Sequence, residues 1–287
     1  MCLKTIIKSI ISQWIIACPI MLFAVLTICT SFTAVKKELP VIQQEDAVAM
    51  EISLNKAREQ VLKLMTFNMR YGVGVDDCLD LNRVIETIRD TDADIIALNE
   101  VDHLMPRSNM QKQDKIIAEQ LGLYFAYGYN INLGSKYGNV LLSRFPIKSF
   151  TNHPLPKSSF SEPRGLIEAD LDVEGNHIKV FVTHLSIKTK ERPEQISFIE
   201  KKIKESEGPT ILMGDFNSLP HSDEMKSLLD LMKDTAMEEY CTYPSYQPEA
   251  RIDYILVSDA FEIKSNKYIG TQSSDHLPVV AEVVLDQ

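Results

Sequence analysis

A series of short apolar runs, each as long as a β-strand and rich in β-branched residues, constrains the fold of this chain more than any other feature. The runs are 61–67, 95–98, 140–143, 166–171, 178–183, 210–213, 254–257 and 279–284. Between several of them, apolar residues recur at helical spacing, which predicts helices at 79–89, 114–120, 192–205 and 225–232. Strands alternating with helices predict an α/β fold. The turn sequence at 172–176 predicts a hairpin, so we expect some of the strands to be antiparallel.

Polar residues follow or open these apolar runs at several places. They are Asn68, Asn99, Glu100, His184, Asp215, Asn217, Asp253, Asp275 and His276. Because ligand sites in α/β sheets lie at strand ends and in the loops beyond them, we expect these residues to form one site. Carboxylate and amide oxygens suit Mg²⁺ or Mn²⁺ better than Zn²⁺, and no Cys or Ser stands in a triad setting, which favours activation of water beside a metal. Each residue taken alone is also typical of an ordinary turn, so the hypothesis depends on their joint occurrence.

Eight strings of the sequence resemble the successive motifs of the endonuclease/exonuclease/phosphatase (deoxyribonuclease I-like) superfamily. They are LKLMTFNMR (62–70), IIALNEVD (95–102), GNVLLSRFPI (138–147), EPRGLIEADL (162–171), VFVTHLS (180–186), ILMGDFNSLP (211–220), RIDYILVS (251–258) and SSDHLPVVAEV (273–283). GDFN and SDHLP are the most specific of them. The resemblance is to a bacterial-type short member and implies a four-layer α/β/β/α sandwich, in which two mixed β-sheets are flanked by helices. It also implies a Mg²⁺- or Mn²⁺-dependent phosphoric ester hydrolase.

The resemblance assigns a metal side to the site. Glu100 is expected to be the principal metal carboxylate, and Asn68 to ligate the metal or orient its ligands. Asp275 lies near the metal side in some relatives of this kind. A divalent cation there would neutralise charge that develops on the phosphoryl oxygens.

The resemblance also assigns a catalytic side. Asp215 would orient and deprotonate the attacking water, and Asn217 would hydrogen-bond a phosphate oxygen. His276 would donate to the phosphate, with Asp253 orienting its ring. His184 would stabilise or protonate the leaving group.

Three arginines are candidate substrate-binding residues. Arg164 is expected to point at the phosphate, because a planar guanidinium suits phosphate oxygens; the alternative is an ion pair with Glu162 or Glu168. Arg70 and Arg107 are expected to line the entrance, with ordinary surface arginine as the alternative.

The N-terminal part of the sequence predicts export or membrane attachment. An uncharged apolar run at 10–34 follows Lys4 and Lys8, which is typical of a signal peptide or a membrane anchor within residues 1–34. A buried core helix is the alternative. Residues 35–60 are polar and predict a linker, and 61–287 the catalytic domain. The body is then expected on the periplasmic or extracellular side, where a Cys78–Cys241 bridge competes with two free thiols.

The charge of the chain bears on its substrate. With a net charge of −10, the protein lacks the excess of Lys and Arg that grips long nucleic acid duplexes. We therefore expect a monomeric hydrolase of a small phosphodiester, a lipid headgroup or a phosphorylated sugar. An extracytoplasmic nuclease of the same superfamily is the alternative, and a catalytically inactive binding module is a remote one.

Overall fold

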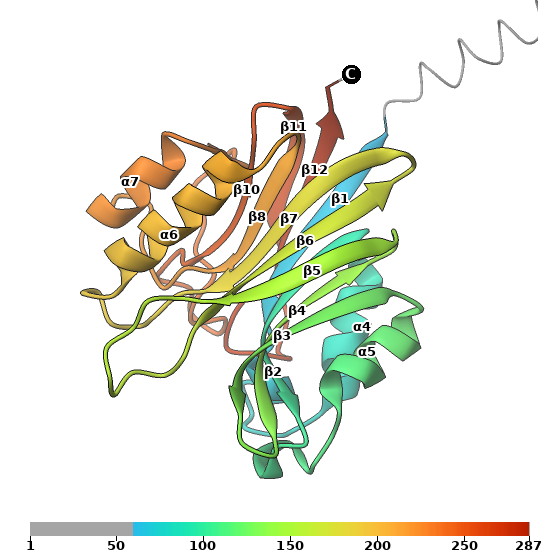
Figure 1. Cartoon of the computed structure of the whole chain (residues 1–287). Helices are drawn as coiled ribbons and strands as arrows, with labels where there is room; N and C mark the ends of the chain where they lie inside the picture. Colours follow the sequence, from blue (N-terminus) through green and yellow to red (C-terminus); the bar gives the residue numbers. More distant parts are fainter. Residues whose placement is uncertain (1–59, 287) are drawn as a thin grey trace, which may run out of the picture. The chain divides into compact units, whose positions relative to one another are not determined.

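The computed structural model describes residues 60–286, and their strands form two six-stranded sheets (Figure 1). The first sheet holds β1 (Val61–Asn68), β2 (Ile95–His103), β3 (Tyr124–Asn132), β4 (Lys136–Ser143), β11 (Phe261–Tyr268) and β12 (Val279–Leu285). The second holds β5 (Ile147–Pro154), β6 (Gly165–Val173), β7 (Asn176–His184), β8 (Thr210–Asp215), β9 (Lys233–Asp234) and β10 (Asp253–Val257). Their orders are β11-β12-β1-β2-β4-β3 and β5-β6-β7-β8-β10-β9. Both sheets are mixed, because β1–β2 and β7–β8 are parallel whereas the other pairs are antiparallel.

In the described part of the chain, helices cover the outer faces of the two sheets (Figure 1). The helices α4 (Leu81–Thr91) and α5 (Gln113–Leu121) pack on the first sheet, and α6 (Arg192–Glu205) and α7 (Asp223–Leu229) on the second. Short 3₁₀ turns lie at Arg70–Gly72 and Pro106–Ser108. Three apolar cores fill the spaces between the layers. The expected four-layer α/β/β/α sandwich is confirmed.

Alternation along the central strands supplies these cores. In β1, Leu62 and Leu64 enter the core between the sheets, whereas Met65 and Phe67 pack toward α4 and α5. All four side chains are buried. Full burial of such a side chain contributes about 1.5–3 kcal/mol, so the period-two pattern fixes which face of the strand points inward.

The parallel strand pairs bring the polar strand ends together. In the first sheet Asn68 pairs with Asn99, and in the second His184 pairs with Asp215. The close approach of β7 and β8 requires a glycine at 214, where an added Cβ would lie 1.9 Å from the Thr183 carbonyl oxygen.

An irregularity in β2 turns Glu100 toward the same edge. The register of β2 against β4 shifts between Leu98 and Val101, and Glu100 within this bulge has a φ of 60°. A left-handed backbone at a residue other than glycine is strained, and bulges re-aim side chains next to active sites.

The structure corrects some of the expectations about secondary structure and decides between others. The strands β3, β5, β9 and β11 were not predicted from the sequence. Cys78 and Cys241 are free thiols, so the structure holds no bridge between them.

The signal peptide or anchor at 1–34, and the linker apart from its last residue, lie outside the described residues. Within 60–286, the longest apolar helices fall short of what a bilayer crossing needs.

Candidate active site

The Asp215 carboxylate lies at the centre of the polar edge. Asn68 Nδ2, from the first sheet, donates to its Oδ2 at 3.0 Å. His184 Nε2, from the second sheet, lies 3.3 Å from the same oxygen, and His276 Nε2 lies 3.8 Å from it. Asp215 is only 1% exposed. Both sheets therefore direct nitrogen atoms at one buried carboxylate oxygen.

The surroundings of Asp215 change its acidity. Burial raises the pKa of this carboxyl, the charge of Asp253 raises it further, and His276 and Asn68 oppose the shift; the result is a pKa of about 7. A carboxylate with a pKa near neutrality is matched to general base catalysis.

Asp253 fixes the orientation and charge of His276. The ring Nδ1 of His276 lies 3.0 Å from Asp253 Oδ2, which also accepts from Thr242 Oγ1 at 2.6 Å. Burial lowers the pKa of His276, but the charges of Asp253, Asp215 and Asp275 outweigh it and raise the pKa to about 10. His276 is therefore a cation at neutral pH. The ring of Tyr243 packs against it, with 4.8 Å between ring centroids.

His184 has the opposite electrostatic setting. Arg164 Nη1 lies 3.0 Å from His184 Nδ1. Burial lowers the pKa of His184 well below its ordinary value, and the positive charges of Arg164 and His276 lower it further. The sequence left open whether His184 stabilises or protonates the leaving group; this environment favours a neutral ring that donates a hydrogen bond.

Glu100 offers the chemistry that a divalent cation needs. Its Oε1 accepts from Asn68 Nδ2 at 3.2 Å, and within residues 60–286 it forms no ion pair with a lysine or arginine. Burial raises its pKa, and Asp275 adds to the effect. The carboxylate oxygens of Glu100, beside the Asn68 amide, are ligands of the kind that Mg²⁺ or Mn²⁺ prefers. Asn68 acts here as an orienting donor, and its Oδ1 accepts from the Arg70 backbone N at 3.1 Å.

A second group of possible metal ligands lies deeper. Among the described residues, Asp215, Asp253 and His276 place ligand atoms within 4.8 Å of one another. The His276 ring already lies between the two carboxylates, 3.0 Å from Asp253 and 3.8 Å from Asp215. The His276 cation is thus hydrogen-bonded to Asp253 and ion-paired with Asp215, so we regard Glu100 as the better cation site.

The remaining predicted residues differ in how near they come to the centre. Asn217 donates its backbone N to Asp215 Oδ1 at 2.8 Å and its Nδ2 to the Leu185 carbonyl at 3.1 Å. Arg164 contacts His184 and also pairs with Glu162 at 3.1 Å, so its expected alternative, an ion pair, is present as well.

The two other arginines are held by neighbours outside the catalytic cluster or at its edge. Arg70 pairs with Asp77 at 3.0 Å and approaches Asp275 at 3.8 Å. Arg107 forms two hydrogen bonds to the buried Asp102 and packs over the rings of Tyr71 and Tyr137.

Sequence reasoning did not assign roles to three residues that support the site. Asn99 accepts from the Asp215 backbone N at 2.9 Å and donates to Asn139 Oδ1 and the Thr183 carbonyl, so it links the two sheets. Thr242 donates a hydrogen bond to Asp253, and the ring of Tyr243 packs against His276. The position of Asn99, a polar residue at the end of an apolar run and next to Glu100, was a signal in the sequence that it belongs to the site. Its role could not be predicted, because its partners Asp215 and Thr183 lie far away in the sequence.

Comparison with known proteins decides the family. The model of the endonuclease/exonuclease/phosphatase family matches residues 65–276. The chain belongs to this family. Its members are hydrolases that act on phosphoesters and use divalent metals, and the resemblance noted in the sequence is confirmed.

Sequence relatives of this family member include two curated proteins. The chain is 28% identical over 206 residues to protein cwh43 of Schizosaccharomyces pombe, covering 67% of this chain but 21% of that protein. It is 26% identical over 248 residues to the uncharacterized protein YbhP of Escherichia coli K12, covering 78% of this chain and 96% of that protein.

Solved structures of family members share the fold. A protein from Beutenbergia cavernae has a TM-score of 0.67 and 25% identity, covering 78% of this chain and 72% of that one. A mannosyl-6-phosphatase from Bacteroides thetaiotaomicron has a TM-score of 0.65 and 20% identity, covering 78% of this chain and 100% of that one.

Proposed function

We propose that this family member is a metal-dependent phosphoesterase that hydrolyses a phosphodiester or phosphomonoester by in-line attack of an activated water. One observation carries the proposal. The buried Asp215 carboxylate, with a pKa near 7, receives a hydrogen bond from Asn68 of the first sheet and faces two histidines of opposite protonation state. Asp215 can act as a base, His276 as a cation and His184 as a neutral hydrogen-bond donor, and this combination suits acid–base chemistry on a phosphate.

The proposed roles follow from charge and geometry. Asp215 Oδ2 takes a proton from the water, whose oxygen attacks phosphorus while the bond to the leaving-group oxygen breaks. His276, held as a cation by Asp253, donates to a non-bridging phosphate oxygen. His184 donates a hydrogen bond from Nε2 to the leaving-group oxygen. Asn217 donates a hydrogen bond to a phosphate oxygen.

The sequence and the site leave Glu100 as the residue that would hold a divalent cation. Glu100 would hold it, with Asn68 and Asp275 as the further ligands that the sequence suggests. When bound, Mg²⁺ or Mn²⁺ supplies neutralisation of charge on the phosphoryl oxygens.

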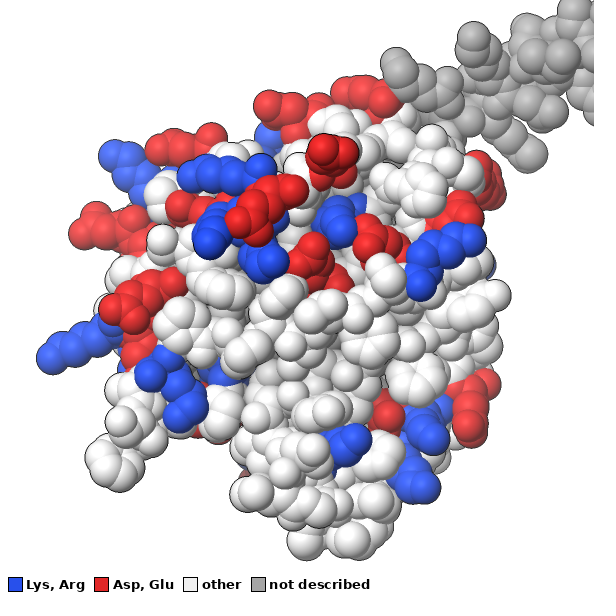
Figure 2. Space-filling view, viewed as in Figure 1, with Lys and Arg blue, Asp and Glu red and all other residues white. Residues whose placement is uncertain are grey.

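We infer that the substrate is small, a lipid headgroup or sugar phosphate, and that a monomer acts on it outside the cytoplasm. The acidic chain supports the first part, and the apolar run at 10–34 supports the location. The fold-level likeness to a mannosyl-6-phosphatase accords with a sugar phosphate. Nuclease activity is less favoured, because Figure 2 shows basic and acidic side chains interspersed on the displayed face, without a basic stripe.

Reporter esters test the proposal. Full-length protein is assayed with bis-p-nitrophenyl phosphate and p-nitrophenyl phosphate in Mg²⁺, Mn²⁺ and chelator, beside His276→Ala. We expect metal-dependent turnover of at least one reporter, lost in the variant. If neither ester is hydrolysed with any metal, the enzyme proposal fails. Plasmid DNA cleaved faster than small phosphate esters would favour the nuclease alternative.

A further inference from the structure

A groove of about 390 Å³ lies where the edges of the two sheets meet. It runs between β3, the last strand of the first sheet, and β5, the first strand of the second. We call it the β3–β5 groove and define it by Tyr129, Asn130, Phe150, Asn152 and Arg164. Its volume is within the range of about 300–1,000 Å³ that is usual for small-ligand sites.

The walls of the β3–β5 groove carry two half-exposed aromatic rings, and Lys136 Nζ lies 4.4 Å from the centroid of the Tyr129 ring. Tyr129 is 43% exposed and Phe150 is 47% exposed. Exposed aromatic rings offer flat apolar faces, and the hydroxyl of a tyrosine adds a polar group. The Phe150 ring, and the part of the Tyr129 ring that Lys136 leaves exposed, are therefore available to a ligand that has an apolar ring face.

Two amides lie beside these rings in a fixed arrangement. Asn152 Nδ2 donates to the Tyr129 carbonyl at 3.0 Å and to Asn130 Oδ1 at 3.3 Å. Asn130 lies directly over Gly165, where an added Cβ would be 2.1 Å from Asn130 Oδ1. Amides both donate and accept, as hydroxyl groups do. Asn152 Nδ2 uses both of its hydrogens in these two bonds and Asn152 Oδ1 is buried, so Asn130 is the amide of the pair that is left to meet a ligand hydroxyl.

Arg164 connects the β3–β5 groove with the catalytic cluster. It lines the groove, and its Nη1 lies 3.0 Å from His184 Nδ1, next to Asp215. Among the lining residues of the groove, only Arg164 is charged. A ligand that fits has a neutral body in the groove and one anionic group at the Arg164 end.

We propose that the β3–β5 groove binds the neutral polyhydroxylated ring, a sugar or an inositol, of a phosphorylated substrate whose phosphate lies at Asp215. The proposal rests on the proposed function and names the substrate class of that same site. The C–H faces of the ring pack on Phe150 and Tyr129, and its hydroxyls pair with the Asn130 amide and the Tyr129 hydroxyl, while Asn152 holds Asn130 in place. A nucleobase is the competing occupant, and the test separates the two.

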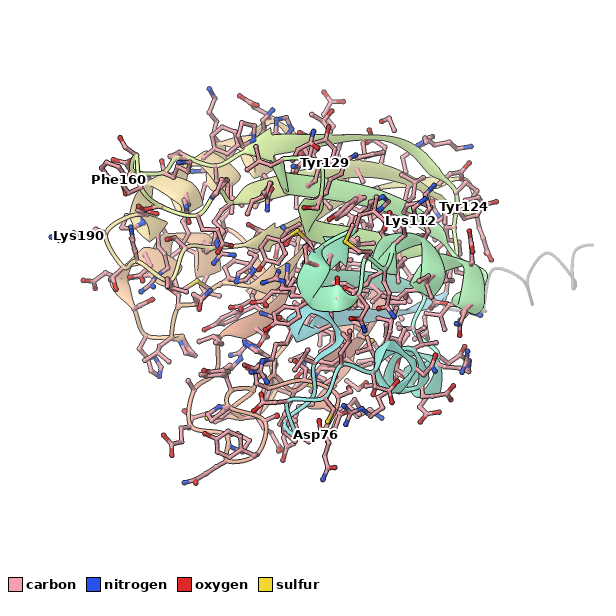
Figure 3. The ribbon with its side chains drawn as sticks, turned by 90° about the horizontal axis from the view of Figure 1, so that it is seen from below. Asp76, Lys112, Tyr124, Tyr129, Phe160 and Lys190 are labelled. Atoms are coloured by element: carbon pink, nitrogen blue, oxygen red, sulfur yellow. The ribbon has the colours of Figure 1, made fainter. Side chains whose placement is uncertain are left out.

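A binding measurement on matched tyrosine variants tests the proposal without turnover. Tyr129→Ala removes a groove wall, and Phe150→Ala serves as a second variant. Tyr124→Ala is the control, because Tyr124 is 54% exposed on the same strand but lies outside the groove. Figure 3 shows Tyr124 and Tyr129 well apart. Saturation-transfer NMR and calorimetry are run on the full-length protein with mannose 6-phosphate, myo-inositol 1-phosphate and adenosine 5′-monophosphate.

We expect at least one ring-polyol phosphate to bind, and its affinity to fall about tenfold in Tyr129→Ala and in Phe150→Ala, as loss of a central aromatic contact gives. Tyr124→Ala should stay within about twofold of the unchanged protein, as for other exposed substitutions. Equal affinity in Tyr129→Ala and Tyr124→Ala, binding of the nucleotide alone, or binding of none of the three ligands at millimolar concentration overturns the proposal. Turnover of methyl p-nitrophenyl phosphate, which lacks the polyol ring, reports separately whether the proposed hydrolytic function fails.

Discussion

The Nη1 atom of Arg164 lies 3.0 Å from the Nδ1 atom of His184. A guanidinium has donors and no acceptor, so Nδ1 must accept and the ring proton is on Nε2. That nitrogen lies 3.3 Å from Asp215 Oδ2. Arg164 therefore acts as a positioning residue that determines which ring nitrogen of His184 donates a hydrogen bond.

Replacing Arg164 by methionine should remove the hydrogen bond to His184 Nδ1, so that the ring proton is no longer fixed on Nε2. Because the positive charge of Arg164 lowers the pKa of His184, the pKa should rise in the variant. We expect reporter kcat to fall about 10–100-fold, which is usual for loss of an orienting partner. The ¹⁵N shifts of the His184 ring measure the tautomer. Arg144→Met is the control; its ion pairs are on the surface and should be worth at most about 1 kcal/mol. An unchanged tautomer in Arg164→Met would contradict the assigned role.

Replacing Asp253 by asparagine should move the alkaline limit of activity to lower pH, and the acid limit with it, because Asp253 raises the pKa of both His276 and Asp215. The unchanged enzyme needs Asp215 ionised and His276 protonated, so kcat/KM should rise up to about pH 7 and fall near pH 10. A bound cation would lower the acid limb, since it favours the carboxylate. In Asp253→Asn the pKa of His276 loses its main support, so the alkaline limb should move toward pH 6.5. An alkaline limb that stays near its original pH contradicts the assignment to His276.

The His276 cation should also make stability depend on pH. Its pKa is raised from 6.5 to about 10 in the folded protein. The cation therefore stabilises the fold fully below about pH 6.5, and this contribution is lost as the pH rises through about 10. Urea unfolding of the unchanged protein and of His276→Gln measures it. The difference in unfolding free energy should shrink across that window; a constant difference would count against the raised pKa.

Asn99 should be essential to the junction between the sheets. In Asn99→Ala, the Asp215 N–H and the Thr183 carbonyl lose their partner in a buried region. Each unsatisfied group costs about 1–3 kcal/mol, so we expect a loss of about 2–5 kcal/mol in unfolding free energy. Asn176→Ala, at the exposed first residue of β7, should change it by less than about 0.5 kcal/mol. Equal stability of the two variants would show that Asn99 does not link the sheets.

The central strands and the polar residues that gather at their ends were predictable because their signals are local. Buried strands such as β8 are continuous apolar runs, and the polar residues at their ends stand out against them. The strand β5 was missed because it is an edge strand with little burial, so its sequence has no apolar alternation. The partners of Asn99 and the setting of His184 depend on contacts between residues far apart in the chain, and no local pattern encodes those contacts.

The most direct test of the account is reporter hydrolysis by Asp215→Asn in the presence of Mg²⁺ or Mn²⁺. The substitution keeps the size of the side chain but removes the base. We predict that kcat falls by at least about 1,000-fold, within the range for loss of a catalytic base, while circular dichroism shows an intact fold. If the folded variant retains kcat within about tenfold of the unchanged protein, Asp215 is not the base and the account of this site is wrong.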